Sequence, residues 1–277
     1  MRYASASDNI AIGRFAAGGS SSTANTGSAN VAIGYEAGKF ATGAANVSIG
    51  YESLKGNTSG SAAEHNTAIG AYTLNVATTA ESNTVVGHSA GGSVTTGDNN
   101  LLLGHDAGKS GSPGGAVSTG SNEIALGDEN ITECNIQVDW TVASDERDKT
   151  DFTALDVGLS FVNSLKPYTY KWDKRIKYVD KTKEDWDKDL DLNTITHDGT
   201  HKEDWLDIGF KAQEVEALEK DAGYKISDKT NLTTSLSGDG KQYGIKYSNF
   251  VPILVKALQE LSAKNDALEA RIKTLEG

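Results

Sequence analysis

One short pattern of apolar and polar positions recurs seven times in the first half of the chain. The copies are NIAIG (9–13), NVAIG (30–34), NVSIG (46–50), NTAIG (66–70), NTVVG (83–87), NLLLG (100–104) and EIALG (123–127). Within each copy a large apolar residue alternates with a mostly small one, which is the period of a β-strand. One face of each predicted strand is therefore apolar, and the other allows close approach. Asparagine before and glycine after each strand are typical of turns.

Strands of three residues cannot form a stable sheet alone, so they must stack on neighbouring copies or on other chains. The closing glycines are 16 to 23 residues apart, which indicates one rung per copy with loops of variable length. We therefore expect a mainly β N-terminal half over residues 1–143, folded as a trimeric β-helix or β-roll. The repeats resemble those of phage tail-fibre shafts and of the heads of trimeric bacterial adhesins.

After the last copy the pattern changes. CNIQVDWTVAS (134–144) alternates as a strand, and PYTYKW (167–172) does so again. Phe152, Leu155, Leu159 and Val162 have helical spacing, closed by Pro167. GFKAQEVEALEKDAG (209–223) predicts a short helix, and TSLSGDGKQYGIKY (234–247) predicts a hairpin. Residues 173–207 are a charged excursion that could be a disordered loop, although its two tryptophans argue against this.

A long helix is expected at the C-terminus, over residues 250–276. Its apolar positions step by three and four, with a polar residue in one core position: Val251, Leu254, Leu258, Leu261, Asn265, Leu268, Ile272 and Leu275. This spacing predicts a coiled coil, although the helix could instead lie on its own domain. The heptads do not distinguish a dimer from a trimer. The second half, 144–277, is thus expected to be an α+β domain that ends in a coiled-coil helix.

Composition divides the chain at the same place. Residues 1–143 hold 22 of the 30 glycines but only 5 of the 26 lysines and arginines. The net charge of −12 argues against nucleic-acid binding and against an anionic membrane surface. No apolar run is long enough for a signal peptide or a membrane span. A single cysteine, Cys134, excludes an internal disulfide, and the abrupt start of the repeats at residue 9 suggests a fragment or the distal end of a fibre.

Candidate chemistry begins where the repeats end. Ser144 precedes Lys149 by five residues, and a lysine can activate a serine by taking its proton. The same residues could simply cap a helical turn. His88 and His105 occupy equivalent positions and could hold an ion, but Tyr35 fills the same position, so a surface ladder is favoured and no metal or other cofactor is expected.

The resemblance of the second half to a known family is more specific. SDERDKT, LDVGLSFVNSLKPYTYKW, IGFKAQEVEAL and YGIKYSNFVPILVKALQEL resemble, in this order, the intramolecular chaperone domain of endosialidase-type phage tail spikes and fibres. The family's Ser-Asp-x-Arg-x-Lys motif falls on Ser144, Asp145, Arg147 and Lys149. The resemblance implies cleavage of the Ala143–Ser144 bond, with Ser144 as nucleophile and Lys149 as general base.

The same resemblance implies a homotrimeric fibre or spike protein of the virion, assembled in the host cytoplasm. Its C-terminal domain would assist folding of the shaft and release itself, as a single-turnover serine peptidase without activity on other substrates. Other tail proteins and a host-surface receptor or glycan are the implied partners. The alternative is an adhesive fibre whose C-terminal half remains as a trimerisation cap. A glycan-degrading spike ranks last, because Glu36, Glu52, Glu64 and Glu81 lie in variable loops.

Overall fold

The computed structural model describes residues 8–19, 27–182, 186–187 and 190–277. The chain folds into two compact units, each assembled from separate stretches of sequence. The first unit comprises residues 1–132, 173–202 and 237–242, and the second comprises 133–172, 203–236 and 243–277. These units follow packing, whereas the predicted domain boundary at residue 143 follows a proposed cleavage site. That boundary stays a prediction.

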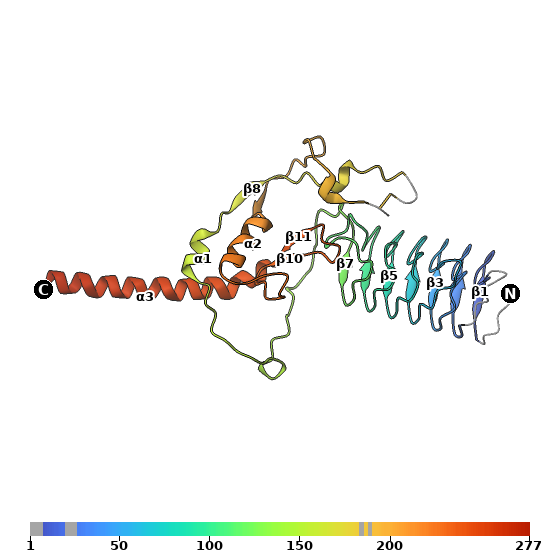
Figure 1. Ribbon diagram of the computed structural model, residues 1–277, viewed down its shortest axis with the longest axis horizontal. Coiled ribbons are helices and arrows are strands. Elements are labelled where there is room, and N and C mark those ends of the chain that lie inside the picture. Colours follow the sequence, from blue (N-terminus) through green and yellow to red (C-terminus); the bar gives the residue numbers. More distant parts are fainter. Residues whose placement is uncertain (1–7, 20–26, 183–185, 188–189) are drawn as a thin grey trace. The chain divides into compact units, whose positions relative to one another are not determined.

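A β-solenoid forms most of the first unit, as predicted (Figure 1). Its seven parallel strands fall within the seven sequence copies: β1 (Ile10–Ile12), β2 (Val31–Ile33), β3 (Val47–Ile49), β4 (Thr67–Ile69), β5 (Thr84–Val86), β6 (Leu101–Leu103) and β7 (Ile124–Leu126). Each strand pairs in register with the next one along the chain. A single chain therefore supplies every neighbour that each inner strand requires.

The interior of the solenoid is lined by the central residues of β2 to β7, which range from alanine to Leu102. Ala32, Ala68 and Val85 are almost fully buried, whereas the flanking apolar residues of several strands lie at the surface. Ile10, Ile12, Ile69, Val86, Ile124 and Leu126 are all between 37% and 71% exposed. The alternation was thus predicted correctly, but the bulkier face is the outer one.

Buried asparagines hold the turns together from one coil to the next. Asn66 is 1% exposed, and its Oδ1 accepts hydrogen bonds from the backbone N and the Nδ2 of Asn83, at 2.9 and 3.0 Å. Its Nδ2 donates to the carbonyl oxygens of Glu64 and Ala80, both at 2.8 Å. The pattern repeats along the stack and ends at Glu123, whose backbone N donates to the asparagine of the preceding coil. These bonds satisfy backbone groups that short strands leave unpaired.

A ladder of rings runs along the solenoid beside the closing glycines. Neighbouring rings have centroids 5.0–6.3 Å apart, and the members in order are Phe15, Tyr35, Tyr51, Tyr72, His88 and His105. The expected surface ladder is present, and both histidines continue it.

Part of the charged excursion folds with the solenoid in the first unit. It carries two short 3-10 helices, at Arg175–Tyr178 and Leu192–Thr194, and buries Ile176 and Leu192. Lys181 pairs with Glu129 of the last coil at 2.5 Å. The interpretation of this stretch as a loop without structure is wrong for these residues, while 183–185 and 188–189 lie outside the described part.

The second unit is a small α+β assembly. It contains α1 (Leu159–Ser164), α2 (Ala212–Asp221) and α3 (Phe250–Glu276), with 3-10 turns at Glu146–Asp148 and Tyr247–Asn249. Strand β8 (Tyr168–Tyr170) pairs with β9 (Asp207–Gly209), and β10 (Thr234–Leu236) pairs with β11 (Tyr243–Ile245), both antiparallel. The hairpin and the last two helices lie where the sequence predicted them.

The core of the second unit joins α1, α2 and the start of α3. Its buried members are Val157, Phe161, Val215, Phe250 and Ile253. Ala257 is also buried, whereas the predicted heptad positions from Leu254 to Leu275 and all of α3 from Leu261 onward are exposed. In the described part of the chain, no helix is both long and apolar enough to cross a membrane.

Two predicted elements are wrong. Residues 134–144 form no strand, because the chain offers them no partner strand, and the apolar side chains of the stretch are exposed. The helix expected from Phe152 begins only at Leu159, because Asp151 has a φ of 56° and Gly158 has φ −148° and ψ −126°, neither of which is helical.

Candidate functional site

The Ser-Asp-x-Arg-x-Lys motif forms one tight turn in the second unit. Asp145 caps the short helix Glu146–Asp148, and its side chain accepts a hydrogen bond from the backbone N of Arg147 at 2.9 Å. Asp145 is the kind of residue that suits this position, since its carboxylate satisfies a free N–H at the helix start. The turn shortens the path between the first and last residues of the motif.

Arg147 folds back on the capping aspartate. Its Nε and Nη2 donate to the two carboxylate oxygens of Asp145 at 3.0 and 2.6 Å, which is a bidentate pair. These hydrogen bonds hold the pKa of Asp145 below its usual range. The two residues therefore support the turn and do not reach the serine hydroxyl.

Ser144 and Lys149 meet across this turn. The Nζ of Lys149 lies 2.6 Å from the Oγ of Ser144 and 3.3 Å from its carbonyl oxygen. Asp145, and not Ser144, caps the helical turn. The Ser144 hydroxyl contacts Lys149 instead. This distance is within the reach that a general base needs to take the proton of a nucleophile.

The pair is fully open to solvent in the single chain. Every residue from 130 to 154 is exposed, including Ala143, Ser144 and Lys149. Trp140 and Val142, just upstream of the predicted scissile bond, are 71% and 78% exposed. Large apolar side chains with this much exposure are therefore grouped just before the Ser144–Lys149 pair.

Other candidate residues have different surroundings. Burial alone would raise the pKa of Glu36, but hydrogen bonds from Lys39 and Lys55 outweigh it and lower that pKa. A carboxyl held ionised in this way is poorly suited to act as a general acid.

The chain matches one family model. The family is described as chaperone of endosialidase, and residues 144–224 are matched. No curated protein and no solved structure matches the chain.

The family match begins at Ser144, the first residue of the motif, and it confirms the resemblance drawn from the sequence. It leaves the Ser144–Lys149 pair itself as a prediction. Residues 144–224 match the chaperone-of-endosialidase model and follow a β-solenoid in the same chain, and this combination supports a phage tail-fibre-like protein.

Proposed function

We propose that this chain is a subunit of a homotrimeric phage tail fibre or spike. Residues 144–277 assist folding of the solenoid and then release themselves by cutting the Ala143–Ser144 bond. The observation that carries the cleavage is the 2.6 Å contact between Lys149 Nζ and Ser144 Oγ, at the first residue of the matched family segment.

Trimer formation is supported by apolar surfaces that the single chain leaves uncovered. The heptad positions of α3 are one such surface: Leu254, Leu258, Leu268 and Ile272 are between 49% and 67% exposed. The outer face of β1 to β7 is another. A parallel trimer would cover both and would bring three copies of the seam together, because all copies run in the same direction.

The cleavage chemistry follows from the geometry of the turn. The neutral amine of Lys149 takes the proton of Ser144 Oγ, and the oxygen attacks the carbonyl carbon of Ala143. The C–N bond to Ser144 then breaks, its nitrogen receives the proton from Lys149, and an ester joins Ala143 to Ser144 Oγ. Water hydrolyses this ester and frees the two chains.

Exposure explains how cutting can wait for assembly. In water near neutral pH a lysine side chain carries its proton as an ammonium group and cannot accept another, whereas burial favours the neutral amine. A trimer that covers residues 130–154 would therefore activate the lysine. The same contact could provide hydrogen-bond donors for the oxyanion.

The test is expression of the untagged chain beside Ser144→Ala, Lys149→Gln and two control variants, Ser164→Ala and Lys166→Gln. We expect fragments of 143 and 134 residues by intact mass from the parent and both controls, and an uncut chain from the other two. Hydroxylamine should trap the ester as a hydroxamate on Ala143. Light scattering then reports whether each product is a trimer.

An uncut parent that is still trimeric would contradict the cleavage. It would support the alternative, a fibre that keeps residues 144–277 as a permanent trimerisation cap. A parent that is monomeric would contradict the trimer itself. Cutting in Ser144→Ala would assign the nucleophile to another residue.

A further inference from the structure

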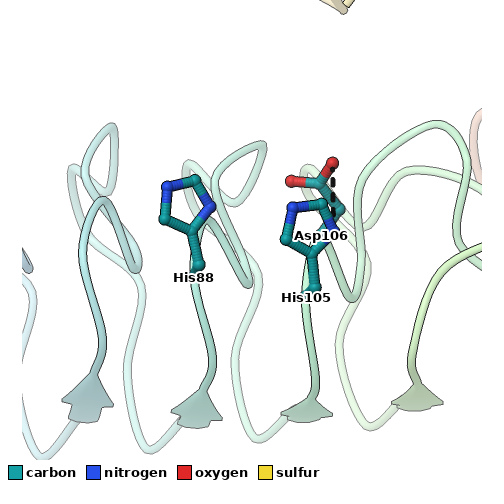
Figure 2. Close-up of side chains that lie close together, drawn as sticks. All are labelled: His88, His105 and Asp106. Atoms are coloured by element: carbon teal, nitrogen blue, oxygen red, sulfur yellow. Dashed lines mark ion pairs between the residues drawn. The ribbon is translucent and has the colours of Figure 1, made fainter.

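Two histidines and an aspartate lie together on consecutive coils of the solenoid. His88 follows β5 and His105 follows β6, and their rings are stacked with centroids 5.5 Å apart and planes 8° apart. One ligand atom from each of His88, His105 and Asp106 lies within 4.8 Å of the other two. Figure 2 shows one ring nitrogen of His88 on the side that faces His105, and the carboxylate of Asp106 over the His105 ring. Three ligand atoms therefore converge from two neighbouring coils.

Asp106 differs from the acidic residues at the same position in earlier coils. Glu36 and Glu52 each form an ion pair with the lysine three residues further on, at 2.6 and 3.0 Å. Lys109, the corresponding lysine here, instead lies 3.5 Å from Asp187. The side chain of Asp106 is only 7% exposed. A bound cation would stabilise such a carboxylate.

His105 is oriented by a second carboxylate. Its Nδ1 lies 2.9 Å from Oδ2 of Asp128, and Asp128 in turn accepts hydrogen bonds from the backbone N and Nδ2 of Asn130, at 2.9 and 2.8 Å. With Nδ1 bonded to Asp128, Nε2 is the nitrogen of His105 that remains for a metal. Because Oδ2 of Asp106 lies 3.7 Å from Nδ1, the Asp106 side chain must rotate toward Nε2 to share the ion.

We propose that His88, His105 and Asp106 bind a divalent transition-metal ion such as Zn²⁺, with Asp128 as a positioning residue for His105. Imidazole and carboxylate are ligands that zinc uses, and three protein ligands leave a fourth position open. Tetrahedral ligands at zinc are about 3.3 Å apart, so the side chains must close by about 1.5 Å through rotation. Ring stacking alone would account for the positions of His88 and His105. It would not account for the burial of Asp106 beside them or for the contact between Asp128 and His105.

The test uses the untagged full-length chain, since a histidine tag would compete for the ion. All four residues lie before Ala143, so they stay in one fragment whether or not the chain is cut. After treatment with a chelator, the protein is titrated with Zn²⁺ by calorimetry and with Co²⁺ by visible absorption. We expect one ion per chain and the d–d bands of cobalt bound to nitrogen and oxygen ligands.

The variants separate binding from stacking. His88→Tyr and His105→Tyr place the ladder's own ring at each position, and Asp106→Asn keeps the shape of the side chain; each should weaken zinc binding more than about 100-fold. Asp128→Asn should weaken it about 10- to 100-fold, as expected for a residue that orients a ligand. Far-UV circular dichroism of each variant confirms that the solenoid is intact.

The matched control is His65→Tyr, on an earlier coil, where His65 contacts Glu81 at 3.2 Å. It should bind zinc as the parent does. The proposal is overturned if the parent shows no cobalt bands, if His88→Tyr or Asp106→Asn binds zinc as the parent does, or if His65→Tyr loses as much affinity as they do. The cobalt spectrum of the parent decides the question even if a variant fails to fold.

Discussion

Replacing Asn66 by alanine tests whether the buried asparagines hold the solenoid together. The backbone N–H of Asn83 donates a hydrogen bond to Oδ1 of Asn66 at 2.9 Å, and the structure shows no other acceptor for it. The substitution removes this acceptor. Asn83 Nδ2 loses one bond but keeps those to Glu81 O and Gly97 O, at 3.1 and 2.9 Å. The orphaned N–H costs about 1–3 kcal/mol and the small void adds more, so we expect about 2–4 kcal/mol of lost stability.

The control for this substitution is Asn57→Ala. Asn57 is exposed, and its side chain accepts one hydrogen bond from the backbone N of Ser59 at 2.9 Å. Its loss should cost less than about 1 kcal/mol. Both changes are made in the Ser144→Ala background, so that all chains have the same length.

The assay is urea unfolding followed by far-UV circular dichroism. With a slope of about 3 kcal/mol per molar urea, the Asn66→Ala midpoint should fall by about 1 M, and the Asn57→Ala midpoint should barely move. Equal midpoints for the two variants would refute the argument, because burial and bonding would then make no difference. Unfolding of a repeat array need not be two-state, so protection of the Asn83 amide from hydrogen exchange provides a second measure.

Three further predictions concern other residues. Gly70→Ala should destabilise the solenoid by about 2–4 kcal/mol, because its φ is +134° and an added Cβ would lie 2.5 Å from the carbonyl oxygen of the next closing glycine; thermal unfolding measures this. Glu219→Ala should cost the second unit about 2–4 kcal/mol in urea unfolding, since its buried carboxylate accepts hydrogen bonds from the backbone and side chains of Thr233 and Thr234 at 2.6–3.2 Å. Tyr170 should ionise at a pKa of about 12, raised by burial and the nearby charge of Asp207. The unfolded tyrosine loses its proton near pH 10, so the second unit should lose stability between pH 10 and 12, and Tyr170→Phe should reduce that loss. The difference in tyrosinate absorbance between parent and variant measures the ionisation, and urea unfolding at each pH measures the stability. Unchanged stability in either of the first two variants, or a normal titration of Tyr170, would contradict the reasoning.

The sequence by itself determined the repeating units and the seam. A strand of three residues with asparagine before it and glycine after it is a local pattern, so β1 to β7 were predicted without knowledge of their partners. The hairpin, α2 and α3 were predicted for the same reason, since turn residues, caps and helical spacing act within a few residues. The motif from Ser144 to Lys149 was identified through its resemblance to the chaperone family, whereas the spacing of the serine and the lysine alone is not specific.

Only the tertiary structure decided which face of each strand points inward. Alternation defines two faces, but only the stacked coils bury the central residues, such as Ala68 and Leu102, and leave apolar flanks such as Ile69 at the surface. The strand predicted at 134–144 failed because a strand needs a neighbour, and no local pattern reveals whether one exists. The helix predicted from Phe152 was shortened by the backbone at Gly158, which the apolar spacing ignores.

The two sites show the same division. Asp145 could be assigned to the motif from the sequence, but only the structure shows that it caps the turn and leaves Ser144 Oγ facing Lys149. His88 and His105 were recognised as equivalent positions, whereas the approach of Asp106 depends on how successive coils stack. Residues 16 to 23 apart in sequence become neighbours in a solenoid because each coil returns to the same place one rung higher. This stacking of coils is a property of the whole fold, so a sequence pattern shorter than one coil cannot predict which side chains it brings together.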